Sequence, residues 1–270
     1  MEFDQIARNG MVLLGCGKMG SAMLAGWLAR GVPAKSVHII DPNPSDWVRN
    51  TGAHLNGALP AAPAVAILAV KPQMMGDALP GLQALGNGTT LFISIAAGTS
   101  LARFSQALGH DTPIIRAMPN TPAAVGCGIT ALIGNDKVSQ AHMELAEGLL
   151  AAVGATVRLE DESQMDAVTA LSGSGPAYVF HMIEAMAQAG TDAGLAPDLA
   201  MQLARATVIG AGQLAAGADE TAEQLRINVT SPKGTTAAAL EVLMDADTGL
   251  SPLMARAVAA AAARSRELAQ

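Results

Sequence analysis

The sequence predicts an α/β fold in two parts, a doubly wound parallel-sheet domain followed by an all-α domain. Two observations support this prediction. In the first half, short apolar runs alternate with helical patterns, as expected of strands that are buried on both faces and connected by helices. After about Asp161 the strand signals stop and only helical patterns continue. We therefore expect two domains, over residues 1–160 and 161–270.

Five near-continuous apolar runs predict the buried strands of the sheet, and two later runs predict strands at its far edge. The expected strands are Met11–Leu14, Val37–Ile40, Val65–Val70, Leu91–Ile95 and Ile114–Met118, with Ile129–Ile133 and Thr156–Leu159 at the edge. The helical patterns in this half cover Met19–Arg30, Gln73–Leu85, Leu101–Leu108 and Val138–Val153.

The second half contains helical patterns separated by glycine and proline, such as Gly194 before Pro197. Stretches such as Ala204–Ala216 and Ala255–Ala263 are small or apolar on most faces, so they require burial on all sides. A domain of this size offers too few neighbours for that, and we expect an intertwined homodimer. The expected helices are Gln164–Leu171, Ala177–Ala193, Pro197–Ala216, Thr221–Asn228, Thr235–Met244 and Pro252–Leu268.

Composition argues against several classes of protein. The 270 residues carry a net charge of -7 and no dense lysine and arginine run, which disfavours binding to duplex nucleic acid. The two cysteines cannot form a disulfide framework, so a reducing, cytoplasmic compartment is expected. No apolar run predicts a membrane span, and the N-terminus does not resemble a signal peptide. The histidines show no metal-binding spacing, so no metal site is expected.

A glycine-rich segment directly follows the first predicted strand and opens the first predicted helix. It is Gly15-Cys16-Gly17-Lys18-Met19-Gly20. In this context the first glycine allows a tight turn, the second lets backbone N–H groups approach a pyrophosphate, and the third permits close packing of helix on strand. The N-terminus of the helix adds positive potential. The segment predicts a dinucleotide site, and a ligand-free turn is the weaker alternative.

Asp41 ends the second predicted strand, about 20 residues after the glycine segment, where an acidic residue binds the adenosine ribose hydroxyls. Such a carboxylate disfavours a 2′-phosphate, whereas Asn43 is able to donate to one. In the alternative interpretation, Asp41 only starts the Asp-Pro-Asn-Pro turn.

Three further strand ends are candidates for the cofactor site, because ligands of doubly wound sheets bind outside the carboxyl ends of strands. Ala69-Val70-Lys71-Pro72 follows one strand, and Lys71 is expected at the crevice unless it is an ordinary solvated lysine. The small residues Ala96 and Ala97 follow the next strand and allow a flat ring to lie close. Asn120 follows the last, either to bond the nicotinamide end or to form a turn between two prolines.

Two motifs in the helical half are candidates for a substrate site. Leu171-Ser172-Gly173-Ser174-Gly175-Pro176-Ala177-Tyr178 is expected to be a flexible polar loop that enters a helix at Pro176. Ser231-Pro232-Lys233-Gly234-Thr235-Thr236 also runs into a helix, and its N–H groups and hydroxyls suit a carboxylate. Ordinary capping by serine and threonine is the alternative for both motifs.

With these residues in view, nearly the whole chain resembles the pyrroline-5-carboxylate reductases, which catalyse the last step of proline biosynthesis. The resemblance rests on the glycine segment and on the two motifs of the helical half. It also rests on Ala69–Pro72, on Arg116–Pro122 and on Asp166–Thr169. It implies a Rossmann domain over residues 1–160 and a helical dimerisation and substrate domain over 161–270, as a homodimer or a larger ring such as a decamer.

The resemblance also implies a reaction, in which NADPH or NADH reduces 1-pyrroline-5-carboxylate to L-proline. Hydride transfer to a protonated cyclic imine needs no protein nucleophile, since the protein supplies orientation. By resemblance, Ser231, Lys233, Gly234 and Thr235 lie in the segment that holds the substrate carboxylate. Thr236 matches the threonine whose hydroxyl bonds the ring nitrogen. Ser174 and its loop are implied to close the pocket, against helices of the partner subunit.

Two positions depart from the family pattern. Lys233 stands where the family usually has a glycine, so it is either a strained residue, if φ is positive there, or an added attraction for the carboxylate. Asp41 stands where many relatives have a small or neutral residue, which puts a preference for NADPH in doubt.

Two other functions are the alternatives. One is a different two-domain NAD(P)-dependent reductase, acting on a hydroxy acid, but that class employs a lysine in its helical domain and here only Lys233 is available. The other is a dinucleotide-sensing protein without catalysis. Thr236 and the Ser172–Pro176 segment argue against a sensor, because a sensor needs no pocket for a second substrate.

Overall fold

A computed structural model describes residues 3–268 of the chain. The chain forms two compact units. The first extends to Gly173 and includes the end of the chain from Ala261 onward, and the second is Ser174–Ala260. The first turns of the helical half, up to Gly173, therefore belong to the first compact unit. The expected domain boundary between residues 160 and 161 stays a prediction.

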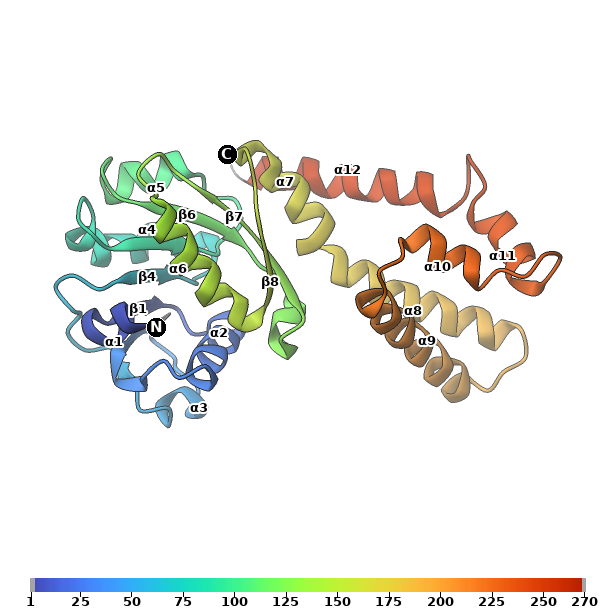
Figure 1. The fold of residues 1–270 in the computed structure, drawn as a ribbon, viewed down its shortest axis with the longest axis horizontal. Helices are drawn as coiled ribbons and strands as arrows, with labels where there is room; N and C mark the ends of the chain where they lie inside the picture. Colours follow the sequence, from blue (N-terminus) through green and yellow to red (C-terminus); the bar gives the residue numbers. More distant parts are fainter. Residues whose placement is uncertain (1–2, 269–270) are drawn as a thin grey trace. The chain divides into compact units, whose positions relative to one another are not determined.

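The first unit contains a sheet of eight strands in the order β3-β2-β1-β4-β5-β6-β7-β8 (Figure 1). Neighbouring strands are parallel except for β6 and β7, which are antiparallel. The strands are β1 (Met11–Leu14), β2 (Val37–Ile40), β3 (His54–Leu55), β4 (Val65–Leu68), β5 (Leu91–Ser94), β6 (Ile114–Met118), β7 (Gly128–Gly134) and β8 (Gly154–Arg158).

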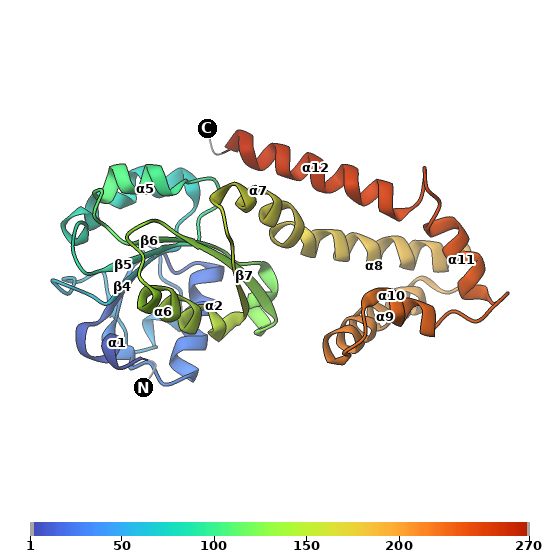
Figure 2. The same cartoon turned by 45° about the horizontal axis from the view of Figure 1, so that its top comes forward.

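Helices cover both faces of this sheet, on opposite sides in Figure 2. Met11 and Leu13 of β1 belong to one core, together with residues of α2 and α6, whereas Val12 and Leu14 belong to the other. This alternation follows from the period of two along a strand, and it explains the continuous apolar runs. The helices of this unit are α1 (Asp4–Asn9), α2 (Lys18–Ala29), α3 (Asp46–Arg49), α4 (Met75–Ala78), α5 (Leu101–Leu108), α6 (Gln140–Leu150) and α7 (Met165–Val168).

Several elements differ from the sequence expectation. The helix expected over Gln73–Leu85 is a single turn of α-helix, α4, between the 3-10 segments Pro72–Met74 and Leu79–Leu85. Pro80 near the start of the second 3-10 segment has no N–H to donate, which interrupts the α-helical pattern. Strand β7 runs antiparallel to β6, so the far edge of the sheet is not parallel to the rest. The short elements α1, α3 and β3 were not expected.

The segment after α7 is helical rather than the flexible loop expected there. Thr169–Gly173 forms a π-helical turn, and α8 begins at Gly175. The Thr169 hydroxyl donates to the Met165 carbonyl at 2.8 Å, and the Ser172 hydroxyl donates to the Val168 carbonyl at 3.1 Å. Serine and threonine make such bonds to the carbonyl four residues back when they lie within a helix, where the bonds often bend it. The expectation of a loop was therefore wrong.

The second unit is all helical, as expected. Its helices are α8 (Gly175–Asp192), α9 (Pro197–Gly217), α10 (Ala222–Asn228), α11 (Thr235–Leu243) and α12 (Leu250–Leu268), the last of which ends in the first unit. Helices α8 and α9 approach closely, since a Cβ added at Gly190 would lie 3.2 Å from the Cβ of Ala200. The connection between these helices follows the expected punctuation. Gly194 has a φ of 104° just after α8 ends, and α9 begins at Pro197 with Ala196 as its N-cap residue.

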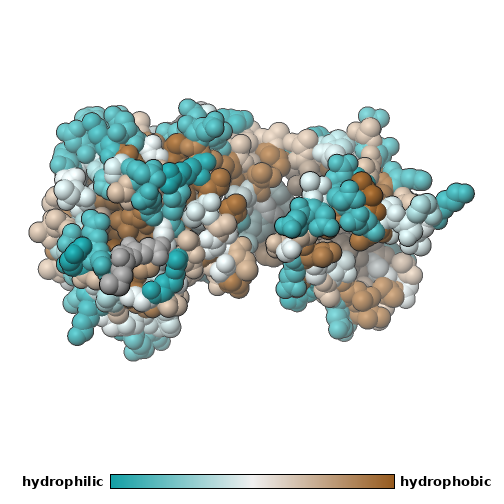
Figure 3. Space-filling view, viewed as in Figure 1, coloured by the Kyte–Doolittle hydropathy of each residue, from teal (hydrophilic) through white to brown (hydrophobic). Residues whose placement is uncertain are grey.

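This second unit leaves most of its large apolar side chains exposed, and apolar surface is visible on it in Figure 3. In the described part of Ser174–Ala260, the buried hydrophobic residues are the alanines 187, 200 and 204. Exposed apolar residues include Phe180 at 61%, Ile209 at 54%, Leu214 at 57% and Val242 at 72%. Such an extensive apolar surface is characteristic of a face that another subunit covers.

Candidate active site

The glycine segment connects β1 to α2 at the carboxyl edge of the sheet. Gly15 has a φ of 86°, and a Cβ there would lie 2.9 Å from the Ala69 carbonyl oxygen. A Cβ at Gly20 would lie 2.6 Å from the Gly15 carbonyl oxygen. These two glycines are therefore required by packing within the protein. A Cβ at Gly17 would meet nothing within 4 Å, so the middle of the segment is open.

The start of α2 fits an anion. Gly17 is the N-cap residue, the first turn contains no acidic residue, and no side chain of the described residues caps this end. The N–H groups of Lys18 and Met19 have no acceptor within the helix, and they lie at the positive end of a helix of 12 residues. Open space beside Gly17 and this helix end together fit a cofactor pyrophosphate.

Asp41 lies beside the glycine segment and is bound to it. The Cys16 N–H donates to Asp41 Oδ2 at 2.7 Å, and the Asn43 N–H donates to Asp41 Oδ1 at 2.8 Å. The second bond is the turn contact that the alternative interpretation expected. The first places the carboxylate at the glycine segment, where the ribose interpretation requires it. One carboxylate has about four acceptor positions, so both roles are compatible. Burial raises the pKa of the adjacent Cys16 thiol, which favours its neutral, packing role.

Two further segments lie along the same edge. Ala69 continues β4 through its N–H, which donates to the Leu14 carbonyl at 2.7 Å, and Val70 packs near Gly15. Lys71 and Pro72 follow, with Lys71 exposed at the start of a 3-10 segment. The Ala96 N–H donates to the Ser94 hydroxyl at 3.2 Å, which fixes the turn where Ala96 and Ala97 leave β5.

Asn120 has a definite structural role. Its Oδ1 accepts from the Ile129 N–H at 3.0 Å, which ties the end of β6 to the start of β7. The preceding Met118 lies against Gly173, since a Cβ added at Gly173 would be 2.8 Å from the Met118 Cε. Within the first unit, the start of the Ser172–Pro176 motif therefore packs beside the end of β6.

The second motif of the helical half forms a turn and a helix start. The Gly234 N–H donates to the Ser231 carbonyl at 3.0 Å, and α11 begins at Thr235. Lys233 has a φ of 60°, so it is in the left-handed conformation that glycine adopts most easily. Gly234 is the N-cap, without a side-chain cap or an acidic residue in the first turn, and Thr236 is half-buried. In the described residues, the hydroxyls of Ser231, Thr235 and Thr236 therefore do not cap the start of α11.

Comparisons with known proteins agree with these features. Residues 162–268 match the family model for pyrroline-5-carboxylate reductase dimerisation, and residues 11–98 match that for NADP oxidoreductase, coenzyme F420-dependent. The pyrroline-5-carboxylate reductase of Pseudomonas aeruginosa is 39% identical over 266 residues, covering 96% of this chain and 97% of that protein. The Haemophilus influenzae enzyme is 38% identical over the same shares of both chains.

This chain belongs to the pyrroline-5-carboxylate reductase family. Solved structures support the assignment. A pyrroline-5-carboxylate reductase from Coxiella burnetii superimposes with a TM-score of 0.91 at 33% identity, covering 97% of this chain and 99% of that one. A Plasmodium falciparum pyrroline carboxylate reductase with NADP bound has a TM-score of 0.81 at 27% identity, covering 98% and 99%.

Within this family frame, the structure groups the expected site residues into two sets. The cofactor candidates lie in the first unit, at the carboxyl edge of β1, β2, β4, β5 and β6. Ser174 and Ser231–Thr236 lie in the second unit. The roles assigned to both sets remain predictions. Among residues 3–268, no three or more His, Cys, Asp or Glu side chains cluster as a metal site would require, and none of the helices is a candidate for a membrane span.

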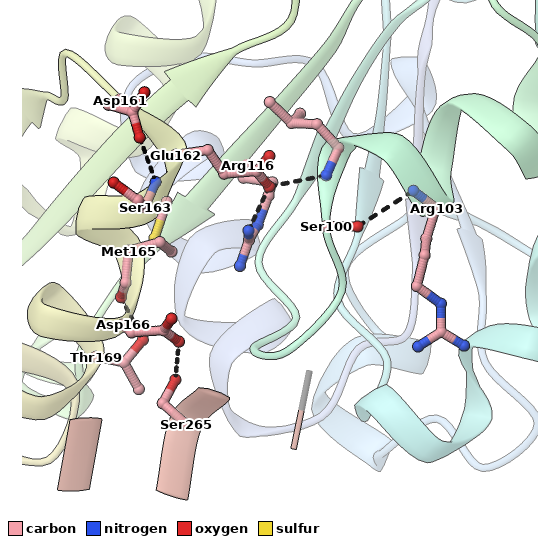
Figure 4. Close-up of polar contacts among 11 residues, drawn as sticks. Ser100, Arg103, Arg116, Asp161, Glu162, Ser163, Met165, Asp166, Thr169 and Ser265 are labelled. Carbon is pink, nitrogen blue, oxygen red and sulfur yellow. Dashed lines mark hydrogen bonds and ion pairs between the residues drawn. The ribbon is translucent and has the colours of Figure 1, made fainter. Parts of the chain in front are cut away.

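One group of polar residues at this edge of the reductase was not identified from the sequence. Glu162 pairs with Arg116 of β6 and accepts from the backbone of α5 (Figure 4). Arg116 was noted only as part of a family segment. A local signal was present, because Asp161 and Gln164 form a reciprocal capping box around Glu162. That signal predicts a helix start, but it does not reveal a distant partner.

Proposed function

We propose that this protein reduces 1-pyrroline-5-carboxylate to L-proline with NADPH or NADH, the last step of proline biosynthesis. The observation that carries the proposal is the uncapped start of α2 behind an open glycine segment, in a chain related over its whole length to pyrroline-5-carboxylate reductases. The bound nicotinamide would supply the hydride, which adds to the carbon of the protonated C=N bond and leaves a secondary amine.

The residues of the chain would bind and orient the two reactants. The glycine segment Gly15–Gly20 would hold the pyrophosphate, and Ala69–Pro72, Ala96, Ala97 and Asn120 would line the nicotinamide half. The N–H groups at the start of α11 would hold the substrate carboxylate, since no side chain of the described residues caps them. The Thr236 hydroxyl would bond the ring nitrogen, and Ser174 would help to close the pocket.

The cofactor preference depends on Asp41. Its carboxylate lies at the glycine segment through the bond from the Cys16 N–H. A 2′-phosphate carries about -1.5 to -2 charge, so it would be repelled at this position, whereas ribose hydroxyls would donate to the carboxylate. We therefore infer that NADH serves at least as well as NADPH.

We propose that the protein forms a homodimer through its helical unit. Such dimers would be the building blocks of any larger ring, such as a decamer. The match of residues 162–268 to a dimerisation model and the exposed apolar side chains of that unit support the dimer. The two free cysteines support a cytoplasmic location, where thiols stay reduced.

The function is tested with the purified full-length protein, by following NADH and NADPH oxidation with pyrroline-5-carboxylate. A panel of keto acids serves as the control. Turnover with pyrroline-5-carboxylate and proline as the product would support the proposal. Turnover only with a keto acid would indicate a hydroxy-acid dehydrogenase, and cofactor binding without any turnover would indicate a sensor.

A further inference from the structure

Glu162 connects three segments of the first unit that are far apart in sequence. It lies at the start of the 3-10 segment Glu162–Gln164, which leads into α7. Its Oε1 pairs with the guanidinium of Arg116 and also accepts from the Leu101 N–H at 2.8 Å. Figure 4 shows the Glu162 carboxylate facing the guanidinium of Arg116. The Arg116 side chain is only 11% exposed and that of Glu162 is 32% exposed, so the pair is largely shielded from water.

Both donors belong to segments that enter the proposed cofactor site. Leu101 is the first residue of α5, directly after the turn that contains Ala96 and Ala97. Arg116 lies beside Ser94 in the sheet register, and Ser94 accepts from the Ala96 N–H. Arg116 is also on the strand that ends at Met118, just before Asn120. A single carboxylate therefore joins the two strand ends where the nicotinamide half is expected.

The charges at this point are complementary. The first turn of α5 contains no acidic residue of its own, so Glu162 brings a carboxylate from elsewhere in the chain to the positive end of that helix. The Ser100 hydroxyl caps the same end by accepting from the Arg103 N–H at 3.3 Å. Because its N–H groups are engaged in this way, the start of α5 is a structural anchor, in contrast to the uncapped start of α2.

The segment that carries Glu162 is also held by a second contact, one turn further along the chain. Asp166, one turn later, accepts from the hydroxyl of Ser265 in α12 at 2.6 Å, and Ser265 is buried. Met165, between Glu162 and Asp166 in the sequence, is 3% exposed and packs into the first unit. The position of Glu162 is therefore set by contacts on both sides of it, as a support for neighbouring loops requires.

We propose that Glu162, paired with Arg116, is a positioning residue of this reductase that holds the β5–α5 and β6–β7 connections in the geometry that binds the nicotinamide cofactor. This rests on the proposed function in one respect, namely that these connections line the cofactor site. Removing the carboxylate would leave Arg116 without its partner in a shielded position and release the start of α5. The two connections would then sample other geometries, and cofactor affinity would fall.

The test compares Glu162→Gln, Glu162→Ala and Arg116→Met with a matched control, Glu147→Gln. Glu147 forms an ion pair with Arg158 at 2.6 Å, between α6 and the edge strand β8, away from the cofactor connections. The control removes the same charge and also breaks a carboxylate–arginine pair, although Arg158 is more exposed than Arg116. The measurements are the dissociation constant of NADH and NADPH by fluorescence titration, kcat and KM for both reactants, and the melting temperature of each variant.

We expect Glu162→Ala to weaken cofactor binding about tenfold, which is about 1.4 kcal/mol. Glu162→Gln should have a smaller effect, because its amide oxygen still accepts from the Leu101 N–H. Arg116→Met should give no additional loss when combined with Glu162→Ala, since both act through one contact. The control should stay within twofold. The KM for pyrroline-5-carboxylate, measured at saturating cofactor, should change less than the KM for the cofactor.

Variants of Glu162 that melt below the wild type but keep its cofactor affinity when folded would overturn the proposal, as they would show a role in stability alone. Equal losses in Glu162→Ala and Glu147→Gln would overturn it too. Because the titration needs no second substrate, it remains decisive even if the wild type fails to reduce pyrroline-5-carboxylate. A wild type that binds neither cofactor would instead refute the proposed function.

Discussion

Lys233 tests whether a lysine at a position that favours glycine lowers the stability of the protein. Ser231, Pro232, Lys233 and Gly234 form a turn that is closed by the bond from the Gly234 N–H to the Ser231 carbonyl at 3.0 Å. Lys233 is the third residue of this turn and has a φ of 60°. A proline followed by a residue of positive φ is the arrangement of a type II turn, in which glycine is preferred at the third position.

The perturbation is Lys233→Gly, and the magnitude follows from this dihedral angle. An L-residue in the left-handed conformation costs roughly 1–2 kcal/mol relative to its preferred conformations. Glycine avoids that cost but loses about 0.5–1 kcal/mol more backbone entropy on folding. We expect a net gain of about 0.5–1 kcal/mol in the free energy of unfolding. For a chain of this size, 1 kcal/mol corresponds to a rise in Tm of about 2–4 °C.

The matched control is Lys233→Ala, which removes the exposed side chain but keeps the positive φ. Its unfolding free energy should lie within about 0.5 kcal/mol of the wild type. Urea denaturation at one fixed protein concentration measures all three proteins, since dimer stability depends on concentration. If the glycine and alanine variants unfold at the same denaturant concentration, backbone strain at residue 233 is not the explanation.

The same variants address the second interpretation of Lys233. If its ammonium group attracts the substrate carboxylate, both variants should raise the KM for pyrroline-5-carboxylate by similar factors. The difference from the wild type should shrink at high salt, because an exposed charge is screened. A changed KM in the glycine variant alone would point to turn geometry instead of charge, because alanine keeps the positive φ of the wild type.

Three further predictions concern the cofactor, the substrate and the assembly. Asp41→Ala should shift the ratio of kcat/KM values toward NADPH, whereas a wild type that prefers NADPH tenfold or more would contradict the inferred role of Asp41. Thr236→Ala should lower kcat/KM for pyrroline-5-carboxylate by the equivalent of about 1–3 kcal/mol at nearly unchanged cofactor affinity; unchanged activity would show that the hydroxyl does not bind the ring nitrogen. The full-length protein should be at least a dimer in light scattering at micromolar concentration, because its helical unit exposes residues such as Phe180 and Val242; a compact monomer would refute this.

The sequence by itself determined the elements whose signals are local. Met11–Leu14, Val37–Ile40 and Ile114–Met118 are strands with the expected bounds, because near-continuous apolar runs are typical of the strands of a parallel sheet that is covered on both faces. The glycine segment was equally predictable, since a strand, a tight turn and a close helix require glycine at fixed positions. The family pattern also indicated that residue 233 favours glycine, and the positive φ there agrees.

Tertiary structure alone decided the features that depend on residues far apart in the chain. Examples are the antiparallel pairing of β7 with β6 and the close approach of Met118 to Gly173, which no local pattern connects. The glycine pattern predicts an acidic residue near the cofactor site, but the bond from the Cys16 N–H to Asp41 is visible only in the tertiary structure. The same holds for Glu162, whose partners Leu101 and Arg116 precede it by 61 and 46 residues. The physical reason is that such contacts form only once packing has fixed each segment in space. Hydrophobic periodicity reports which face of a segment is buried, but not which polar group it meets.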